Sequence, residues 1–296
     1  MNNQYENCLL CGRACGKNRR EGELGYCKMS AVPTVARAAL HAWEEPCISG
    51  TRGSGTVFFT GCSLGCIFCQ NRAISGGKVG RCVSDEHLAE IMLKLEADGA
   101  HNINFVTPTH FAPSVVSSVK LARKRGMSLP IVYNTSSYDT LDALRMLEGT
   151  VDVYLADYKY HLPKTAGTLS NAENYPEIAR AAIAEMVRQK PTPVIEDGIM
   201  RSGVIVRLLL LPGKVAEAKL AVKYLHDTYG DAVYLSLMSQ YTPMPDMPRP
   251  LDRTVTRAEY AELVDYAIEK GITHAFVQDG KSATESFIPA FDLTGV

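Results

Sequence analysis

The sequence has no run of about 18 or more apolar residues, the length at which a helix could cross a membrane. Its polar start, Met1-Asn2-Asn3-Gln4, is not that of a secretory signal peptide. Neither charge is in excess, because 31 Lys and Arg face 32 Asp and Glu, for a formal net charge of -1. The composition therefore gives no reason to expect nucleic acid or a membrane as a partner, and we expect a cytoplasmic protein.

The sequence also lacks cysteine after Cys82, although it contains nine cysteines in total. All the others lie in the first 70 residues. Because a reducing compartment keeps thiols free of disulfides, this concentration indicates metal binding near the N-terminal end. There is no internal repeat or low-complexity segment, and the glycines of the turn at 50–55 do not match the dinucleotide-binding pattern.

Three cysteines, Cys62, Cys66 and Cys69, follow the apolar run at 56–59 with the spacing C-x3-C-x2-C. This spacing is too tight for disulfides and suits an iron–sulfur cluster, which ordinarily takes four thiolates. With three protein ligands, one iron keeps an open position where a small molecule can bind the metal directly. The alternative is a non-catalytic scaffold whose cysteines hold zinc.

A second set of cysteines, Cys8, Cys11, Cys15 and Cys27, lies in a Gly-rich segment with few large apolar residues. Such a segment cannot form its own core, so a metal held by four thiolates is expected to stabilise it. Two alternatives stay open here, a second iron–sulfur cluster for electron entry and a structural zinc site. Cys47 and Cys82 are expected to be small buried hydrophobic residues.

Strand and helix patterns alternate along the rest of the chain. Strands are predicted at 56–61, 102–108, 130–135, 151–158, 203–211, 232–238 and 273–278, and helices near 85–99, 113–125, 139–148, 171–189, 214–229 and 256–270. The predicted N-caps are Ser84, Asp139 and Thr256, and the predicted helix ends are Gly126, Gly230 and Gly271. This alternation predicts an α/β fold with parallel strands, and 296 residues suit one barrel domain.

In a parallel β/α barrel the active site lies at the C-terminal ends of the strands. Polar residues occur at those ends in Thr107-Pro108-Thr109-His110, Asn134, Asp157-Tyr158-Lys159, Arg207 and Ser239-Gln240-Tyr241. The sequence does not identify a catalytic residue, and the candidates are Asp157, His110 and Tyr241. The Pro-rich stretch at 242–250 is predicted as a long loop where a lid or a substrate surface could sit.

The cysteine motif, with aromatic Phe68 before its third cysteine, resembles the signature of the radical S-adenosylmethionine (SAM) enzymes. Further segments are similar to homologues of pyruvate formate-lyase activating enzyme over about residues 50–280: Asp157-Tyr158-Lys159, Val206-Arg207, Leu211-Pro212-Gly213 and Phe276-Val277-Gln278. The N-terminal cysteines with Trp43-Glu44-Glu45-Pro46 resemble an uncharacterised subgroup of these proteins.

The resemblance implies a partial (β/α)6 TIM-like barrel over 50–296, preceded by a small cysteine-rich extension over 1–49. It implies a [4Fe-4S] cluster on Cys62, Cys66 and Cys69, SAM as the second cofactor, and an electron donor such as flavodoxin or ferredoxin. The cofactor-binding residues that it implies are Phe68, Thr107, Thr109, Asn134, Lys159, Arg207 and Gln240. Lys159 matches the basic residue near the SAM carboxylate.

Two segments depart from the family pattern. Gln240 stands where a histidine is expected, and Thr107-Pro108-Thr109-His110 stands where a Gly-Gly-Glu-like turn usually holds the SAM amino group. Thr107 and Thr109 can offer oxygens instead, while His110 is equally well explained as a neutral structural histidine.

Two further points bear on charge and electron supply. Lys159 and Arg207 have an alternative explanation as ion-pair partners of Asp157 or Glu196. No ferredoxin-like insertion follows Cys69, so any additional cluster must be N-terminal.

The resemblance implies an enzyme that cleaves SAM reductively to a 5'-deoxyadenosyl radical, which abstracts a hydrogen atom from a protein or small-molecule substrate. Activation of a glycyl-radical enzyme is the best-understood role in this family. Peptide modification or methyl transfer by the same cofactors is the first alternative, and the zinc-binding scaffold is the second.

Overall fold

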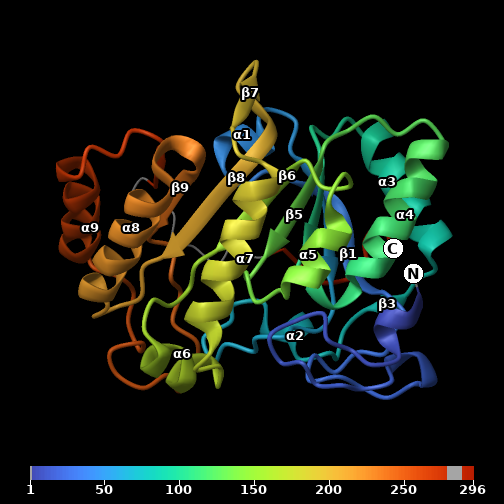
Figure 1. The fold of residues 1–296 in the computed structure, drawn as a ribbon, viewed down its shortest axis with the longest axis horizontal. Coiled ribbons are helices and arrows are strands. Elements are labelled where there is room, and N and C mark those ends of the chain that lie inside the picture. Colours follow the sequence, from blue (N-terminus) through green and yellow to red (C-terminus); the bar gives the residue numbers. More distant parts are fainter. Residues whose placement is uncertain (1, 279–288) are drawn as a thin grey trace.

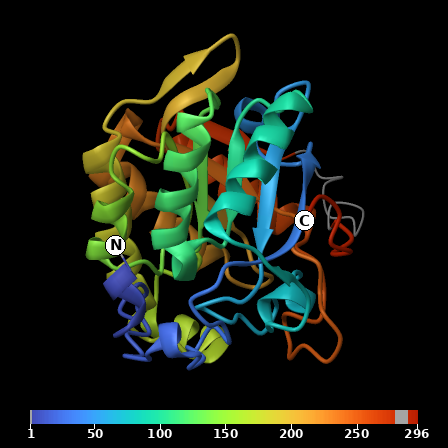
Figure 2. The same cartoon turned by 90° about the vertical axis from the view of Figure 1, so that its right-hand side faces the viewer.

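The computed structural model describes residues 2–278 and 289–296, so residues 279–288 of the predicted barrel domain lie outside the described residues. Within the described part, one sheet of ten strands in the order β10-β9-β8-β6-β5-β4-β2-β1-β3, with β7 paired to β8, forms a partial barrel. Helices cover the outer face of this sheet (Figures 1 and 2). No helix among the described residues is long and apolar enough to cross a membrane.

The parallel part of the sheet follows the chain order. Its strands are β2 Ser54–Phe59, β4 Ile103–Val106, β5 Ile131–Thr135, β6 Val153–Asp157, β8 Ile199–Leu209, β9 Tyr234–Met238 and β10 Ala275–Val277. Every residue of β2, β4 and β5 is buried, as expected for parallel strands covered on both faces. The predicted strands and the α/β fold class are confirmed.

The helices after these strands agree with the predicted ranges to within a few residues. They are α3 Asp85–Ala97, α4 Ala112–Lys124, α5 Leu141–Leu147, α7 Tyr175–Gln189, α8 Val215–Tyr229 and α9 Arg257–Glu269. Ser84 caps α3 by accepting a bond from the His87 N–H, and Thr256 forms a capping box with Glu259. The short helices α2 Arg72–Ser75 and α6 Pro163–Ser170 were not predicted.

The predicted N-cap role of Asp139 is wrong. The residue that precedes α5 is Thr140, and the Asp139 side chain is buried. Its carboxylate accepts hydrogen bonds from the Tyr133 hydroxyl at 3.0 Å and from the Thr135 hydroxyl. Burial raises the pKa of Asp139, although these hydroxyls oppose the rise. The carboxylate therefore ties the end of β5 to the following loop instead of capping a helix.

The first 50 residues contain more regular structure than the sequence indicated. Strand β1 Thr34–His41 pairs antiparallel with β2 and with the two-residue strand β3 Arg81–Cys82, so the sheet begins well before residue 49. Helix α1 Pro46–Ser49 places Ile48 in a buried cluster with residues of β5, β6 and β8. The predicted domain boundary at residue 49 stays a prediction.

The two ends of the barrel carry different structures. Helix α1 and strand β7 Val194–Glu196, a hairpin partner of β8, lie at one edge of the sheet, at the top of Figure 1. The N-terminal cysteine segment, α2 and α6 lie at the opposite edge. This second edge is where the parallel strands end, because the loop after β2 leads directly into the cysteine motif. The candidate site therefore lies there.

Candidate functional site

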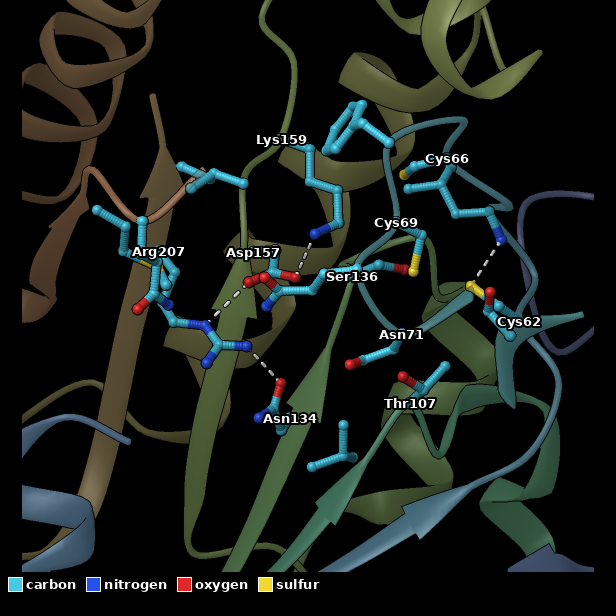
Figure 3. A pocket seen from close by; sticks show the side chains of 18 of the residues that line it. Cys62, Cys66, Cys69, Asn71, Thr107, Asn134, Ser136, Asp157, Lys159 and Arg207 are labelled. Atoms are coloured by element: carbon cyan, nitrogen blue, oxygen red, sulfur yellow. Dashed lines mark hydrogen bonds and ion pairs between the residues drawn. The ribbon is translucent and has the colours of Figure 1, made fainter. Parts of the chain in front are cut away.

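A cavity of about 230 Å³ lies inside the partial barrel and reaches the C-terminal ends of the strands. The cysteine loop forms one side of it, and charged residues at the ends of β6 and β8 form the other (Figure 3). The predicted residues that line it are Cys62, Cys66, Cys69, Phe68, Thr107, Asn134, Lys159, Arg207 and Gln240, with the catalytic candidates Asp157 and Tyr241. The structure brings these residues together, and their individual roles stay predictions.

The sulfurs of the cysteine loop face hydrogen-bond donors. The Leu64 N–H lies 3.4 Å from Cys62 Sγ. Cys66 Sγ accepts from the Ser170 hydroxyl at 3.0 Å and from the Tyr160 hydroxyl at 3.4 Å. Hydrogen bonds to sulfur stabilise its anionic form, which is the form that binds metal.

Burial raises the pKa of the Cys62 thiol to about 12 and also raises the pKa of Cys69. A metal bound here must therefore displace protons, as metal binding to thiols ordinarily does. Among the described residues, no group of three or more His, Cys, Asp or Glu side chains is arranged to hold a single metal ion. Three thiols with donors at one side of a cavity nevertheless fit an iron–sulfur cluster that has one open iron.

Asp157, at the end of β6, joins two cations. Its carboxylate accepts from Lys159 Nζ at 2.6 Å and from Arg207 Nε at 2.9 Å (Figure 3). Burial favours the neutral form of Asp157, but the two adjacent positive charges outweigh it and hold its pKa below the usual range. Burial likewise opposes the charge on Lys159, yet Asp157 keeps its pKa above the usual range. All three groups are therefore charged at neutral pH.

Glu44, which comes from the segment between β1 and α1, completes this network from below. Its Oε2 lies 3.1 Å from Arg207 Nη1, and its Oε1 accepts from the side-chain amides of Asn104 at 3.0 Å and Asn134 at 3.3 Å. Glu44 is thus the site residue that the sequence analysis missed. Its signal was present in the Trp43-Glu44-Glu45-Pro46 motif, which was used only for the resemblance.

The neighbouring Glu45 is buried beneath the cavity. One of its carboxyl oxygens, Oε2, has no hydrogen-bond partner among the described residues, and burial raises its pKa. Glu44 and Glu45 together therefore place one charged and one neutral carboxyl group at the floor of the barrel.

Thr109 and His110 are the predicted site residues that the structure places outside the cavity. Thr109 is buried, with its hydroxyl 3.2 Å from that of Thr135. His110 Nε2 donates to the Thr60 carbonyl at 2.8 Å. Burial, with help from the charge of Arg19, lowers the pKa of His110 to about 3. His110 is therefore a neutral structural histidine, the alternative considered for it above.

Arg207 pairs with Asp157, as one of the two alternatives for it stated, whereas Glu196 pairs with Arg201. Of the two unassigned cysteines, Cys47 is buried as expected and Cys82 is exposed, which contradicts the expectation for Cys82.

The four N-terminal cysteines come together beside the cysteine loop. Cys8, Cys11 and Cys27 are buried and Cys15 is partly exposed. Burial raises the pKa of Cys11 to about 12 and raises that of Cys27. These thiols form a second group, and the metal predicted for them is not tested by their arrangement alone.

Residues 56–160 match the family profile of the radical SAM superfamily. An uncharacterized protein of Methanocaldococcus jannaschii is 32% identical over 187 residues, which are 60% of this chain and 53% of that protein. The chain thus spans about half the length of this curated relative.

Solved structures with the same fold include the FeFe-hydrogenase maturase HydG from Carboxydothermus hydrogenoformans, with a TM-score of 0.53 and 12% identity over 79% of this chain and 56% of that one. Methylornithine synthase has a TM-score of 0.51 and 14% identity over 73% of this chain and 62% of that one. SuiB of Streptococcus suis bound to S-adenosylmethionine gives 0.51 and 10% over 74% and 48%. These low identities establish a shared fold.

The charge network predicts a large loss of stability when Glu44 is changed to Ala. Removal of one partner of a buried ion pair leaves the other charge poorly compensated, so Glu44→Ala should lower the free energy of unfolding by about 3 kcal/mol. The matched control is Glu196→Ala, because the exposed pair of Glu196 with Arg201 contributes about 0–1 kcal/mol. Urea denaturation measures both variants, and equal losses would show that Glu44 carries no special load.

Proposed function

Because the chain is a member of the radical SAM superfamily, we propose that it binds a [4Fe-4S] cluster on Cys62, Cys66 and Cys69 and SAM in the adjoining cavity. The cluster and SAM, when bound, supply reductive cleavage of SAM to a 5'-deoxyadenosyl radical, and we propose that this radical abstracts a hydrogen atom from a protein or small-molecule substrate. The observation that carries the proposal is that three thiols and an uncommitted lysine line one cavity.

Lys159 is the cation best placed to bind the SAM carboxylate. All three guanidinium nitrogens of Arg207 already donate, to Asp157, Glu44 and Asn134. Lys159 Nζ has one printed partner, Asp157, and an ammonium group has three donors. Lys159 therefore retains donors for a ligand, and Asp157 orients it. Arg207 is better described as a positioning residue.

Phe68 and Tyr241 support an enclosed site. Their rings are in edge contact, with centroids 6.0 Å apart, and both line the cavity. Tyr241 donates its hydroxyl to the Leu251 carbonyl at 2.7 Å, which anchors the Pro-rich loop beside the opening. An apolar wall of this kind limits the access of water to a reactive intermediate.

The proposal predicts that anaerobically reconstituted protein with dithionite converts SAM to 5'-deoxyadenosine and methionine. Cys66→Ala should abolish this conversion, because it removes a cluster ligand. Cys82→Ala is the matched control, since that thiol is exposed and lies outside the cavity, and it should retain full turnover. Chromatographic assay of 5'-deoxyadenosine measures both, and turnover by the Cys66 variant would refute the cluster assignment.

A second prediction concerns SAM affinity. Lys159→Ala should weaken SAM binding by about 1.5–3 kcal/mol, the value of a lost hydrogen bond to a charged group, while iron content stays unchanged. Lys164→Ala, which removes an exposed lysine of α6, should leave the affinity as it is. Equilibrium dialysis with labelled SAM provides the measurement. An unchanged affinity of the Lys159 variant would transfer the role to Arg207.

The finer proposal is activation of a glycyl-radical enzyme, which rests on the similarity of Asp157-Tyr158-Lys159 and Val206-Arg207 to activating enzymes. Incubation of the reduced protein and SAM with a candidate glycyl-radical enzyme should then give a persistent organic radical signal on that partner in electron paramagnetic resonance. SAM cleavage without such a signal for any tested partner would favour the alternatives of peptide modification or methyl transfer. A colourless protein that contains zinc would favour the scaffold.

A further inference from the structure

We propose that Cys8, Cys11, Cys15 and Cys27 hold a second iron–sulfur cluster, which passes single electrons to the cysteine loop at 62–69. The metal-binding part of this inference stands on the N-terminal segment alone. The electron-transfer part rests on the proposed function.

The fold of the N-terminal segment gathers the four thiols. Reciprocal backbone hydrogen bonds close the first loop, from the Cys8 N–H to the Lys17 carbonyl and from the Gly16 N–H to the Cys8 carbonyl, both at 3.1 Å. The chain then returns at Gly25, where an added Cβ would lie 3.2 Å from Cys27 Sγ and 3.6 Å from Cys15 Sγ. Sulfurs separated by up to 19 residues thus face one small volume.

The sulfurs of both cysteine sets meet the same donor pattern. The backbone N–H two residues after the cysteine bonds to the sulfur at Cys11, Cys15 and Cys27. The same bond occurs at Cys62 and Cys69 in the barrel loop. A neutral thiol is a weak acceptor, whereas a metal-bound thiolate is a strong one. The N-terminal turns therefore have the local geometry of the loop that the family assigns to a cluster.

Arg19 gives independent support for negative charge at this site. Its side chain is 1% exposed, and its donors reach the carbonyls of Met29 at 3.0 Å, Ser30 at 2.6 Å and His110 at 2.7 Å, and Cys8 Sγ at 3.5 Å. None of its ion pairs among the described residues involves a carboxylate. A buried guanidinium without a counter-ion is costly. Four thiolates on a metal would supply the missing negative charge.

The arrangement favours a cluster over a single zinc ion. Four sulfurs around one Zn²⁺ each lie ~2.3 Å from the metal and so must converge closely. Neither cysteine set among the described residues is arranged to hold a single ion. Iron–sulfur clusters hold their thiolates farther apart than one ion does, so two sets that share donors without converging fit clusters.

Arg13 connects the two cysteine sets directly. It lies between Cys11 and Cys15, and its guanidinium donates to the carbonyls of Ser63 and Leu64, both at 2.9 Å, in the loop between Cys62 and Cys66. It also reaches the Ser170 carbonyl at 2.8 Å, and the hydroxyl of that serine bonds to Cys66 Sγ. A short hydrogen-bonded route therefore links the two loops.

A second contact joins the loops at Gly61. This residue has φ +87°, and a Cβ on it would lie 2.6 Å from the Cys27 carbonyl oxygen. Only glycine allows the two chains to approach this closely. The residue beside Cys62 thus packs on the backbone of Cys27.

The transfer is a one-electron step. A donor of the flavodoxin or ferredoxin class is oxidised by one electron and reduces the N-terminal cluster, which then returns to its oxidised state as the barrel cluster is reduced. No bond is made or broken in this step. Cys15, which is partly exposed, is the side of the N-terminal site nearest to solvent.

The first test isolates the N-terminal site. Protein with Cys62→Ala, Cys66→Ala and Cys69→Ala should retain roughly four iron and four sulfide per chain after anaerobic reconstitution, against roughly eight of each in the wild type. If the triple variant does not fold, the wild-type count alone decides between eight and four. Zinc at this site, or roughly four iron in the wild type, would overturn the proposal.

The second test measures the connection. Arg13→Gln keeps all seven ligands but loses the charged bridge, so turnover with reduced flavodoxin should fall about tenfold or more while turnover with dithionite changes much less. In the doubly reduced wild type, electron paramagnetic resonance should show magnetic interaction between two clusters. Equal losses with both reductants, or two non-interacting spectra, would overturn the electron transfer.

These outcomes separate the two proposals. Failure of the wild type to cleave SAM with dithionite, with both clusters assembled, would refute the proposed function and leave the second cluster in place. SAM cleavage by a protein whose N-terminal site holds zinc would do the reverse.

Discussion

Arg207 carries a positive charge into the interior of the barrel, where water cannot solvate it, and the surrounding structure compensates that charge from three directions. Asp157 contributes from the adjacent strand β6, Asn134 from β5, and Glu44 from a segment more than 150 residues away in the chain. Because the charge must be matched, the segment before α1 is held inside the barrel as its floor. The shape of the cavity, and the freedom of Lys159 to meet a ligand, both follow from this arrangement.

The cysteine sets show how local backbone geometry and long-range packing cooperate. The turn that points an N–H at each sulfur is local, since it spans two residues, and it recurs in both sets. The contact between the sets is not local, because Arg13 and Gly61 are 48 positions apart. The N-terminal segment has few apolar residues, so these polar contacts and a bound metal take the place of a core.

Sequence patterns predicted the elements whose signals are local. Strands such as β2 and β5 are continuous apolar runs buried on both faces, and helices such as α3 and α9 carry capping residues. The cysteine loop was predicted because its spacing is itself the signal.

The features that the sequence did not reveal depend on contacts across the fold. β1 has mixed burial and small residues, so its pattern is weak until β2 lies beside it. Asp139 resembles an N-cap in sequence, yet two hydroxyls from β5 draw it inward. Glu44 was missed because its partners come from three distant strands, and such convergence leaves no periodic trace. The floor that Glu44 provides also has a consequence for biosynthesis. Arg207 leaves the ribosome long after the first fifty residues, so the N-terminal cysteines must wait, exposed and without their final neighbours, until β8 has been made. Metal delivery before that point would meet a flexible chain, which makes insertion after synthesis the favoured order for this protein.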